Sequence, residues 1–129
     1  MKNTKLAYYV TTLLVTLLFA MSGGMMIVMP PPMVQMFHEL GLPVYFHTLL
    51  GACKLGGLVF IWWPNTSVKL WAYHGYTYLM GGAIFTHLAS GQSFTHAAGA
   101  MIGLTLTLTS MVFCNHLSQS EAVIEKKKY

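Results

Sequence analysis

The sequence has no arginine and no aspartate, and it has only three acidic residues in all. These are Glu39, Glu121 and Glu125. Charged residues make up 8% of the 129-residue chain, whereas hydrophobic residues make up 55% and the net charge is +4. A soluble domain usually carries about 25% charged residues. The shortage of charge therefore excludes an ordinary soluble domain and indicates a membrane protein.

Several functional classes lose support through what is missing. Nucleic-acid binding would need a clustered basic patch, and no such patch occurs within the apolar segments. Proton-coupled pumps usually rely on carboxylates within the membrane, and none is present there. The two cysteines, Cys53 and Cys114, form no CxxC or CxxCH motif, so zinc-ribbon, thioredoxin-like and c-type haem sites are excluded. We predict no dedicated metal site and no nucleic-acid partner.

Four apolar segments are long enough to cross a bilayer, which takes about 20 helical residues. They are residues 6–28, 43–63, 69–89 and 94–117, and a short basic tail follows over 118–129. Lys2 and Lys5 precede the first span, Lys69 lies at the start of the third, and Lys126 to Lys128 follow the fourth, whereas the other two loops contain no lysine. The positive-inside rule then places both termini in the cytoplasm. We predict one transmembrane domain over 1–129, in a plasma or inner membrane, with the lipid bilayer as its immediate partner.

The first outer loop is predicted to contain a short helix of its own. Three prolines, Pro30 to Pro32, end the first span, and Met33, Val34, Phe37 and Leu40 then share one helical face. Such an apolar face is typical of a helix that lies on the membrane surface. The predicted fold class is therefore all-α, an integral membrane four-helix bundle with a short interfacial helix in the first outer loop.

Small and polar residues recur along the predicted spans at helical spacing. In the last span this pattern comprises His96, Gly99, Gly103, Thr107, Ser110 and Cys114. In lipid, helices associate through close contact at small residues, so this face should point into the bundle. Similar patterns on other spans also leave a homo-oligomer open.

Lys54 is the most unusual residue of the chain, because it lies near the middle of an apolar span. At 1.5 Å per residue its Cα is roughly 13 Å from either end of that span. An ammonium at such depth costs roughly 2.5–3.5 kcal/mol on insertion scales. Three explanations stay open: desolvation keeps the amine neutral, hydroxyls, carbonyls or imidazoles solvate it, or a ligand oxygen accepts from it.

Histidines gather toward the same outer side of the predicted bundle. His47 lies two turns outward from Lys54 on the same helical face, while His87 and His96 flank the second outer loop. We predict a polar pocket in the outer half, with Lys54 and these three histidines as candidate catalytic residues. The candidate ligand-binding residues are Tyr73, Tyr76, Met80 and Gln92.

The segments "LGLPVYFHTLLGACKLGGL" and "KLWAYHGYTYLMGGAIFTHLASGQ" make the chain similar to the DoxX-like family of small four-helix membrane proteins. The most specific matches are Leu40-Gly41-Leu42-Pro43, Gly51 with Lys54, Pro64, the run Lys69, Trp71, Ala72, Tyr73 and Gly75, and His87 with Gly91. In the family pattern an acid commonly follows, where this chain has Gln92. The resemblance implies a role near membrane redox systems, including quinone-linked oxidation, although many relatives have no assigned activity.

Three functions therefore stay open. In the first, Lys54 donates to an oxygen of a lipophilic small molecule such as a quinone, in a module associated with a membrane redox partner. In the second, the chain is itself an enzyme, such as an isomerase of lipophilic substrates that uses haem or the lysine and histidines. In the third, the protein is structural and its polar residues only fix helix register. The sequence leaves enzymatic activity undecided.

Overall fold

The computed structural model describes residues 2–128 and is helical throughout, with short connections. The elements in order are α1 (Lys2–Val28), α2 (Pro31–Glu39), α3 (Val44–Ile61), α4 (Thr66–Ala89) and α5 (Phe94–Lys126). The predicted all-helical fold class, four long helices and one short helix, is confirmed.

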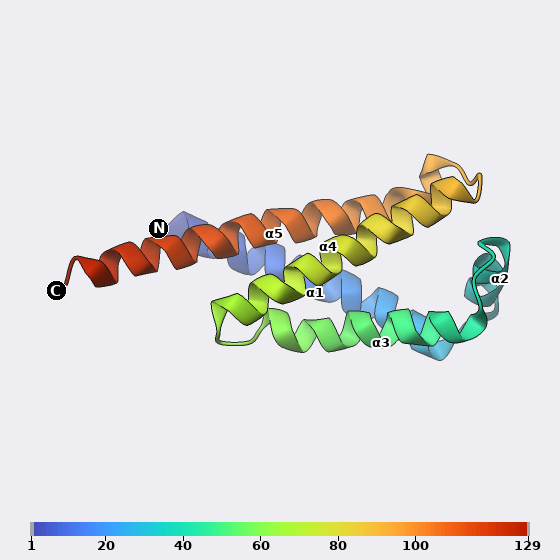
Figure 1. Ribbon diagram of the computed structural model, residues 1–129, viewed down its shortest axis with the longest axis horizontal. Coiled ribbons are helices and arrows are strands. Elements are labelled where there is room, and N and C mark those ends of the chain that lie inside the picture. Colours follow the sequence, from blue (N-terminus) through green and yellow to red (C-terminus); the bar gives the residue numbers. More distant parts are fainter. Residues whose placement is uncertain (1, 129) are drawn as a thin grey trace.

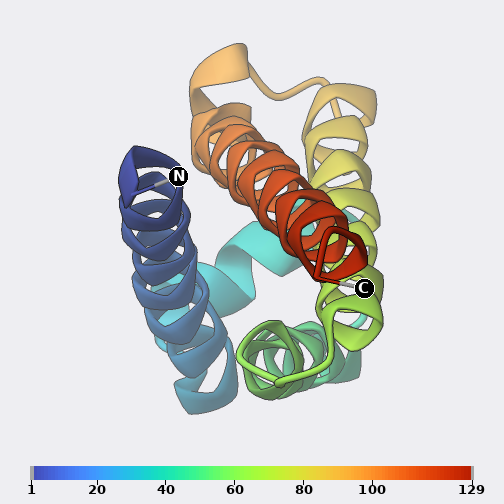
Figure 2. The same ribbon diagram turned by 90° about the vertical axis from the view of Figure 1, so that its left-hand side faces the viewer.

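The four long helices enclose a common axis, which Figure 2 shows end-on. α1 packs against α3 and α5, and α4 packs against the same two helices. Both chain termini and the α3–α4 turn lie at one end of the bundle, which we call the terminal end (Figure 1). α2 lies at the opposite end, across the space that the long helices surround (Figures 1 and 2).

Within residues 2–128, three helices are long and apolar enough to span a membrane: α1, α3 and α5. α4 has 24 residues but is not as apolar by the same measure. The third predicted span, over 69–89, therefore stays a prediction, which the packing of α4 between α3 and α5 supports. The predicted fourth span ended at residue 117, whereas α5 continues as a helix to Lys126. Tyr129, the last residue of the predicted tail, lies outside the described residues.

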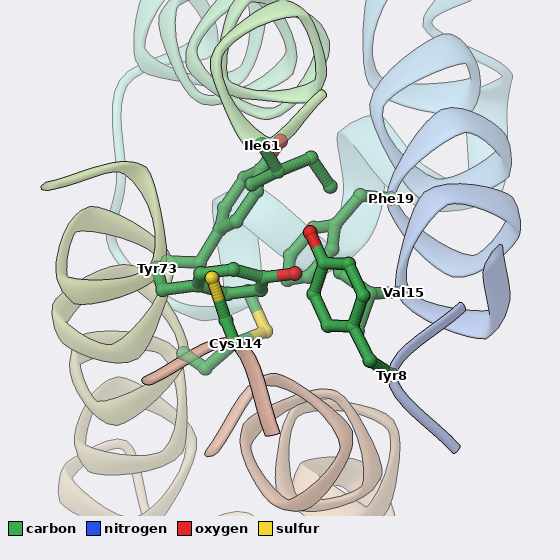
Figure 3. Close-up of a cluster of buried hydrophobic side chains, with 8 residues drawn as sticks. Tyr8, Val15, Phe19, Ile61, Tyr73 and Cys114 are labelled. Carbon is green, nitrogen blue, oxygen red and sulfur yellow. The ribbon is translucent and has the colours of Figure 1, made fainter. Parts of the chain in front are cut away.

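The core at the terminal end combines apolar packing with hydroxyl groups. Val15 and Phe19 of α1, Ile61 of α3 and Tyr73 of α4 are each at most 1% exposed (Figure 3). The Tyr73 hydroxyl also contacts Ser110 Oγ of α5 at 2.8 Å. Polar contacts of this kind connect helices without any charge, in a part of the bundle where water is excluded.

Thr12 completes this buried contact on α1. Its Oγ1 lies 3.1 Å from the Tyr73 hydroxyl and 2.8 Å from Ser110 Oγ. Three hydroxyls from α1, α4 and α5 therefore form one closed set. Because every member has two partners, the set fixes the relative register of three helices.

α2 follows the amphipathic pattern that the sequence predicts. Phe37 is 3% exposed, and Met33, Val34 and Leu40 are partly buried, whereas Gln35, His38 and Glu39 face outward. Gly41, with a φ of +71°, ends the helix in the left-handed region that favours glycine. The apolar face of α2 is thereby turned toward the bundle and can cover its end.

Candidate functional site

Lys54 lies inside the bundle and is only 6% exposed. Its amine donates a hydrogen bond to Ser22 Oγ of α1 at 2.7 Å. Among residues 2–128 this is its sole hydrogen bond, and no carboxylate forms an ion pair with it. An ammonium has three N–H donors. Two of these donors are therefore available to a ligand.

Glycines bring α1 and α3 close enough for this contact. A Cβ placed on Gly23 would lie 3.1 Å from Lys54 Cβ, and one on Gly51 would lie 3.0 Å from the Gly23 carbonyl oxygen. Contacts this short are tighter than side chains normally allow, so alanine at either position would push the helices apart. The close approach positions Ser22 beside the lysine.

Lys54 borders a cavity between α3 and α4, which we call the side cavity. Its volume is about 270 Å³. Phe46 and Leu50 form its wall on α3, and Leu79 and Ala83 form its wall on α4. Tyr78, which also lines it, is 79% exposed on the outer surface of α4. Because that surface is apolar, the side cavity adjoins the region that lipid would occupy.

Lys54 also borders a second cavity, the central cavity, which has a volume of about 290 Å³. Leu18 and Ser22 of α1, Met80 of α4 and Ala100 of α5 contribute to its lining. Five residues line both cavities: Met26, Met36, Lys54, Ala83 and His87. The two spaces therefore meet at the lysine and at His87. Each volume is near the lower end of known ligand sites, which measure about 300–1,000 Å³.

His87 is the histidine that the structure brings to both cavities together with Lys54. Its Nδ1 lies 2.6 Å from Gln92 Oε1. A carbonyl oxygen can only accept, so Nδ1 carries the proton and the neutral ring keeps Nε2 as an acceptor. Gly91, with a φ of +74°, makes the turn that brings Gln92 back to His87. Gln92 thus orients His87 and does not itself line either cavity.

The other predicted histidines are placed differently. His96 lines the central cavity but is an exposed residue. Its Nδ1 lies 3.1 Å from Ser93 Oγ. His47 lines neither cavity and is 0% exposed. Its ring packs edge-on against Phe37 of α2, with ring centroids 4.6 Å apart. In the part of the chain that the structure describes, neither ring nitrogen of His47 has a hydrogen-bond partner.

Among the predicted ligand-binding residues, Met80 lines the central cavity, whereas Tyr73 and Tyr76 line neither cavity. Tyr73 belongs to the buried hydroxyl set. Tyr76 stacks on Phe19, with ring centroids 4.1 Å apart, and its hydroxyl donates to the Lys54 carbonyl oxygen. Tyr76 therefore supports the backbone at Lys54 and the Phe19 ring, which lines the central cavity.

The residues of α1 and α2 at the site could hardly be predicted from the sequence. Ser22, the hydrogen-bond partner of Lys54, was not among the residues predicted for the site. Met26 and Met36 line both cavities. Methionine side chains are flexible and fill irregular spaces, so they suit the wall of a cavity that binds a ligand. Among residues 2–128, no three side chains of histidine, cysteine or acid type come together as metal ligands.

The fold and the site define a small helical membrane protein with a buried lysine at the junction of two apolar cavities. The model of the DoxX-like family matches residues 10–111, a range that contains Lys54 and His87 with their hydrogen-bond partners Ser22 and Gln92. The chain belongs to the DoxX-like family, as its motifs suggest. No curated protein and no solved structure matches the chain significantly.

Proposed function

We propose that this protein is a membrane-embedded binding module for a lipophilic molecule that carries a carbonyl oxygen, of which a quinone is the simplest example. The observation that carries the proposal is Lys54, a residue that is only 6% exposed and whose amine has one hydrogen-bond partner within residues 2–128. Buried ionisable groups in membranes usually mark functional sites. A ligand oxygen would accept from the two remaining N–H groups.

The walls of the cavities suit an apolar ring and tail. Phe46, Leu50 and Leu79 offer apolar surface, while Lys54 and His87 are the ionisable groups that line both spaces. Ligand sites typically combine apolar walls with a few precisely placed polar groups. The ligand would enter from the lipid through the side cavity, next to Tyr78.

His87 gives the proposed site a group that can exchange a proton. Its Nε2 is free to accept a hydrogen bond, because Nδ1 is committed to Gln92. A histidine near a bound carbonyl compound can accept or supply a proton when the compound changes its redox state. This supports a redox-associated module that works with a membrane partner, in line with what the family resemblance implies.

The orientation in the membrane is part of the proposal. All lysines except Lys54 belong to segments at the terminal end: Lys2, Lys5, Lys69 and Lys126 to Lys128. By the positive-inside rule, the terminal end would face the cytoplasm. The two cavities would then lie in the outer half of the bilayer.

Binding of decylubiquinone to the purified protein in mild detergent tests the proposal. We expect saturable binding by the wild type and at least tenfold weaker binding by Lys54→Met, since a charge-assisted hydrogen bond contributes about 1.5–3 kcal/mol. Lys126→Met, which removes an exposed lysine at the far end of the bundle, is the matched control and should bind normally. Equal binding by all three proteins would refute the lysine-centred site.

Lys54→Met also distinguishes a purely structural role of the lysine from a role in ligand binding. If Lys54 only fixed helix register, Lys54→Met would keep or gain stability, and no ligand would depend on it. A visible spectrum of the protein purified from membranes would detect haem and so address the alternative of a haem-dependent enzyme.

A further inference from the structure

We propose a second binding site at the terminal end, distinct from the Lys54 cavities, that takes an oxyanion of the phosphate type. A cavity of about 110 Å³ lies there between α1, the start of α4 and the last turns of α5. Its lining includes Lys5, Tyr8, Thr66, Lys69, Cys114 and Glu121. None of these residues lines the Lys54 cavities.

The charges around this terminal cavity do not cancel. Lys5 Nζ forms an ion pair with Glu121 Oε1 at 3.6 Å, and both side chains are about half exposed or more, at 49% and 63%. Lys69 has no carboxylate partner within residues 2–128. Its ammonium lies 5.5 Å from the centroid of the Tyr8 ring. One positive charge therefore remains over the cavity, which favours an anion and disfavours a cation.

Tyr8 contributes its ring to the wall of this cavity. The residue is 5% exposed, and its hydroxyl is buried, out of reach of a ligand in the cavity. Figure 3 shows this hydroxyl directed from α1 toward the bundle axis, on the side of the Tyr73 hydroxyl. The face of the Tyr8 ring only partly offsets the charge of Lys69, so an anion in the cavity can still bind to the ammonium.

These groups together select the chemistry of the ligand. Lys69 supplies a positive charge that no carboxylate within residues 2–128 pairs with, and Thr66 adds a hydroxyl at the first residue of α4. A phosphate group presents several acceptor oxygens and a negative charge within a small volume. The phosphate group can belong to the head group of an anionic phospholipid at the membrane surface or to free phosphate. The residues of the cavity would bind either one through the same oxygens.

Glu121 leads to the prediction that removing one charged side chain from the cavity strengthens anion binding. Its carboxylate lines the cavity and repels an anion, although Lys5 holds it. Glu121→Gln should therefore strengthen anion binding, whereas Lys69→Gln should weaken it about tenfold through the loss of one charge-assisted contact. Lys2→Gln is the matched control, because Lys2 is an exposed lysine of the same helix end that does not line the cavity.

Two probes distinguish the possible sources of the phosphate group. Native mass spectrometry of protein released from nanodiscs with equal phosphatidylglycerol and phosphatidylcholine measures retained lipid, and calorimetry with inorganic phosphate measures binding of the free ion. Preferential retention of phosphatidylglycerol supports a lipid head group, and binding of phosphate alone supports a soluble anion. In either case affinity should follow the order Glu121→Gln, wild type with Lys2→Gln, then Lys69→Gln.

The proposal is overturned if the wild type binds neither probe, or if Lys2→Gln loses as much affinity as Lys69→Gln. The second result would mean that only the overall positive charge matters. Should Lys69→Gln fail to fold, Glu121→Gln decides alone, because its side chain is exposed and its removal leaves the packing intact. Unchanged or weaker binding by Glu121→Gln would then refute the site.

Discussion

The Lys54 amine and Ser22 Oγ lie 2.7 Å apart, across the interface between α3 and α1. This contact places the amine at the junction of the side and central cavities. A serine hydroxyl cannot neutralise an ammonium, so the charge of Lys54 is left uncompensated by any other side chain of residues 2–128. That mismatch is the physical basis of the proposed ligand site.

The Lys54–Ser22 pair itself can be tested by a double-mutant cycle. Ser22→Ala removes the acceptor but leaves the buried amine, so we expect the free energy of unfolding to fall by about 1–3 kcal/mol. In the Lys54→Met background the same change should cost much less, because the donor is gone. Equilibrium unfolding in mixed detergent measures both. Equal losses in the two backgrounds would show that the pair contributes no coupling.

The orientation of His87 should depend on Gln92. With Gln92 present, the neutral ring carries its proton on Nδ1, which donates to Gln92 Oε1. In Gln92→Ala we expect the population to shift toward the other tautomer, and ¹⁵N NMR of labelled histidine distinguishes the two. Gln92→Glu, which introduces the acid typical of the family pattern, should favour the doubly protonated ring. An unchanged His87 spectrum in Gln92→Ala would contradict the predicted role of Gln92.

The backbone at Lys54 should be sensitive to packing at Gly57. A Cβ there would lie 2.6 Å from the Tyr76 hydroxyl, which donates to the Lys54 carbonyl oxygen. Gly57→Ala should therefore displace Tyr76 and lower the free energy of unfolding by about 1–3 kcal/mol. Gly56→Ala is the matched control, since nothing lies within 4 Å of its added Cβ. Similar stability of the two variants would argue against the tight Gly57–Tyr76 contact.

The buried hydroxyl set should stabilise the terminal half of the bundle. Tyr73→Phe removes a hydroxyl with two partners, Thr12 and Ser110, and should cost about 0.5–1.5 kcal/mol for each hydrogen bond lost. Tyr78→Phe removes a hydroxyl from a side chain that is 79% exposed and should have little effect. Thermal unfolding measures the difference. A Tyr73→Phe variant as stable as Tyr78→Phe would show that the set contributes nothing.

The burial of Lys54 could be predicted because the cost of an ammonium in lipid leaves few alternatives. The apolar face of α2 was equally predictable, since Phe37 and its neighbours follow helical spacing. The position of α2 across the end of the bundle could not be predicted. Periodicity shows which face of a helix is apolar but not which part of the protein that face covers. His47 shows the consequence: we expected it in a polar pocket, but Phe37 packs on it and it lines neither cavity.

The long-range hydroxyl contacts also could not be predicted from the sequence. The Thr12–Ser110 contact joins residues 98 positions apart, and each residue alone has the spacing of an ordinary packing position. Tyr73 was therefore predicted to bind a ligand, although its hydroxyl is satisfied within the core. On α5, Gly103, Thr107, Ser110 and Cys114 of the predicted inward face are buried, whereas His96 and Gly99 are exposed and line the central cavity.

Photolabelling with a diazirine derivative of decylubiquinone tests the central claim most directly, because it reports where the ligand lies. We expect labelled peptides from the walls of the Lys54 cavities, between Phe37 and Lys54 and between Tyr78 and His87, and we expect excess decylubiquinone to compete. Lys54→Met should lose this labelling, while Lys126→Met should retain it. Labelling spread over the lipid-facing surfaces of α1 and α5, unaffected by competitor and by Lys54→Met, would contradict the account.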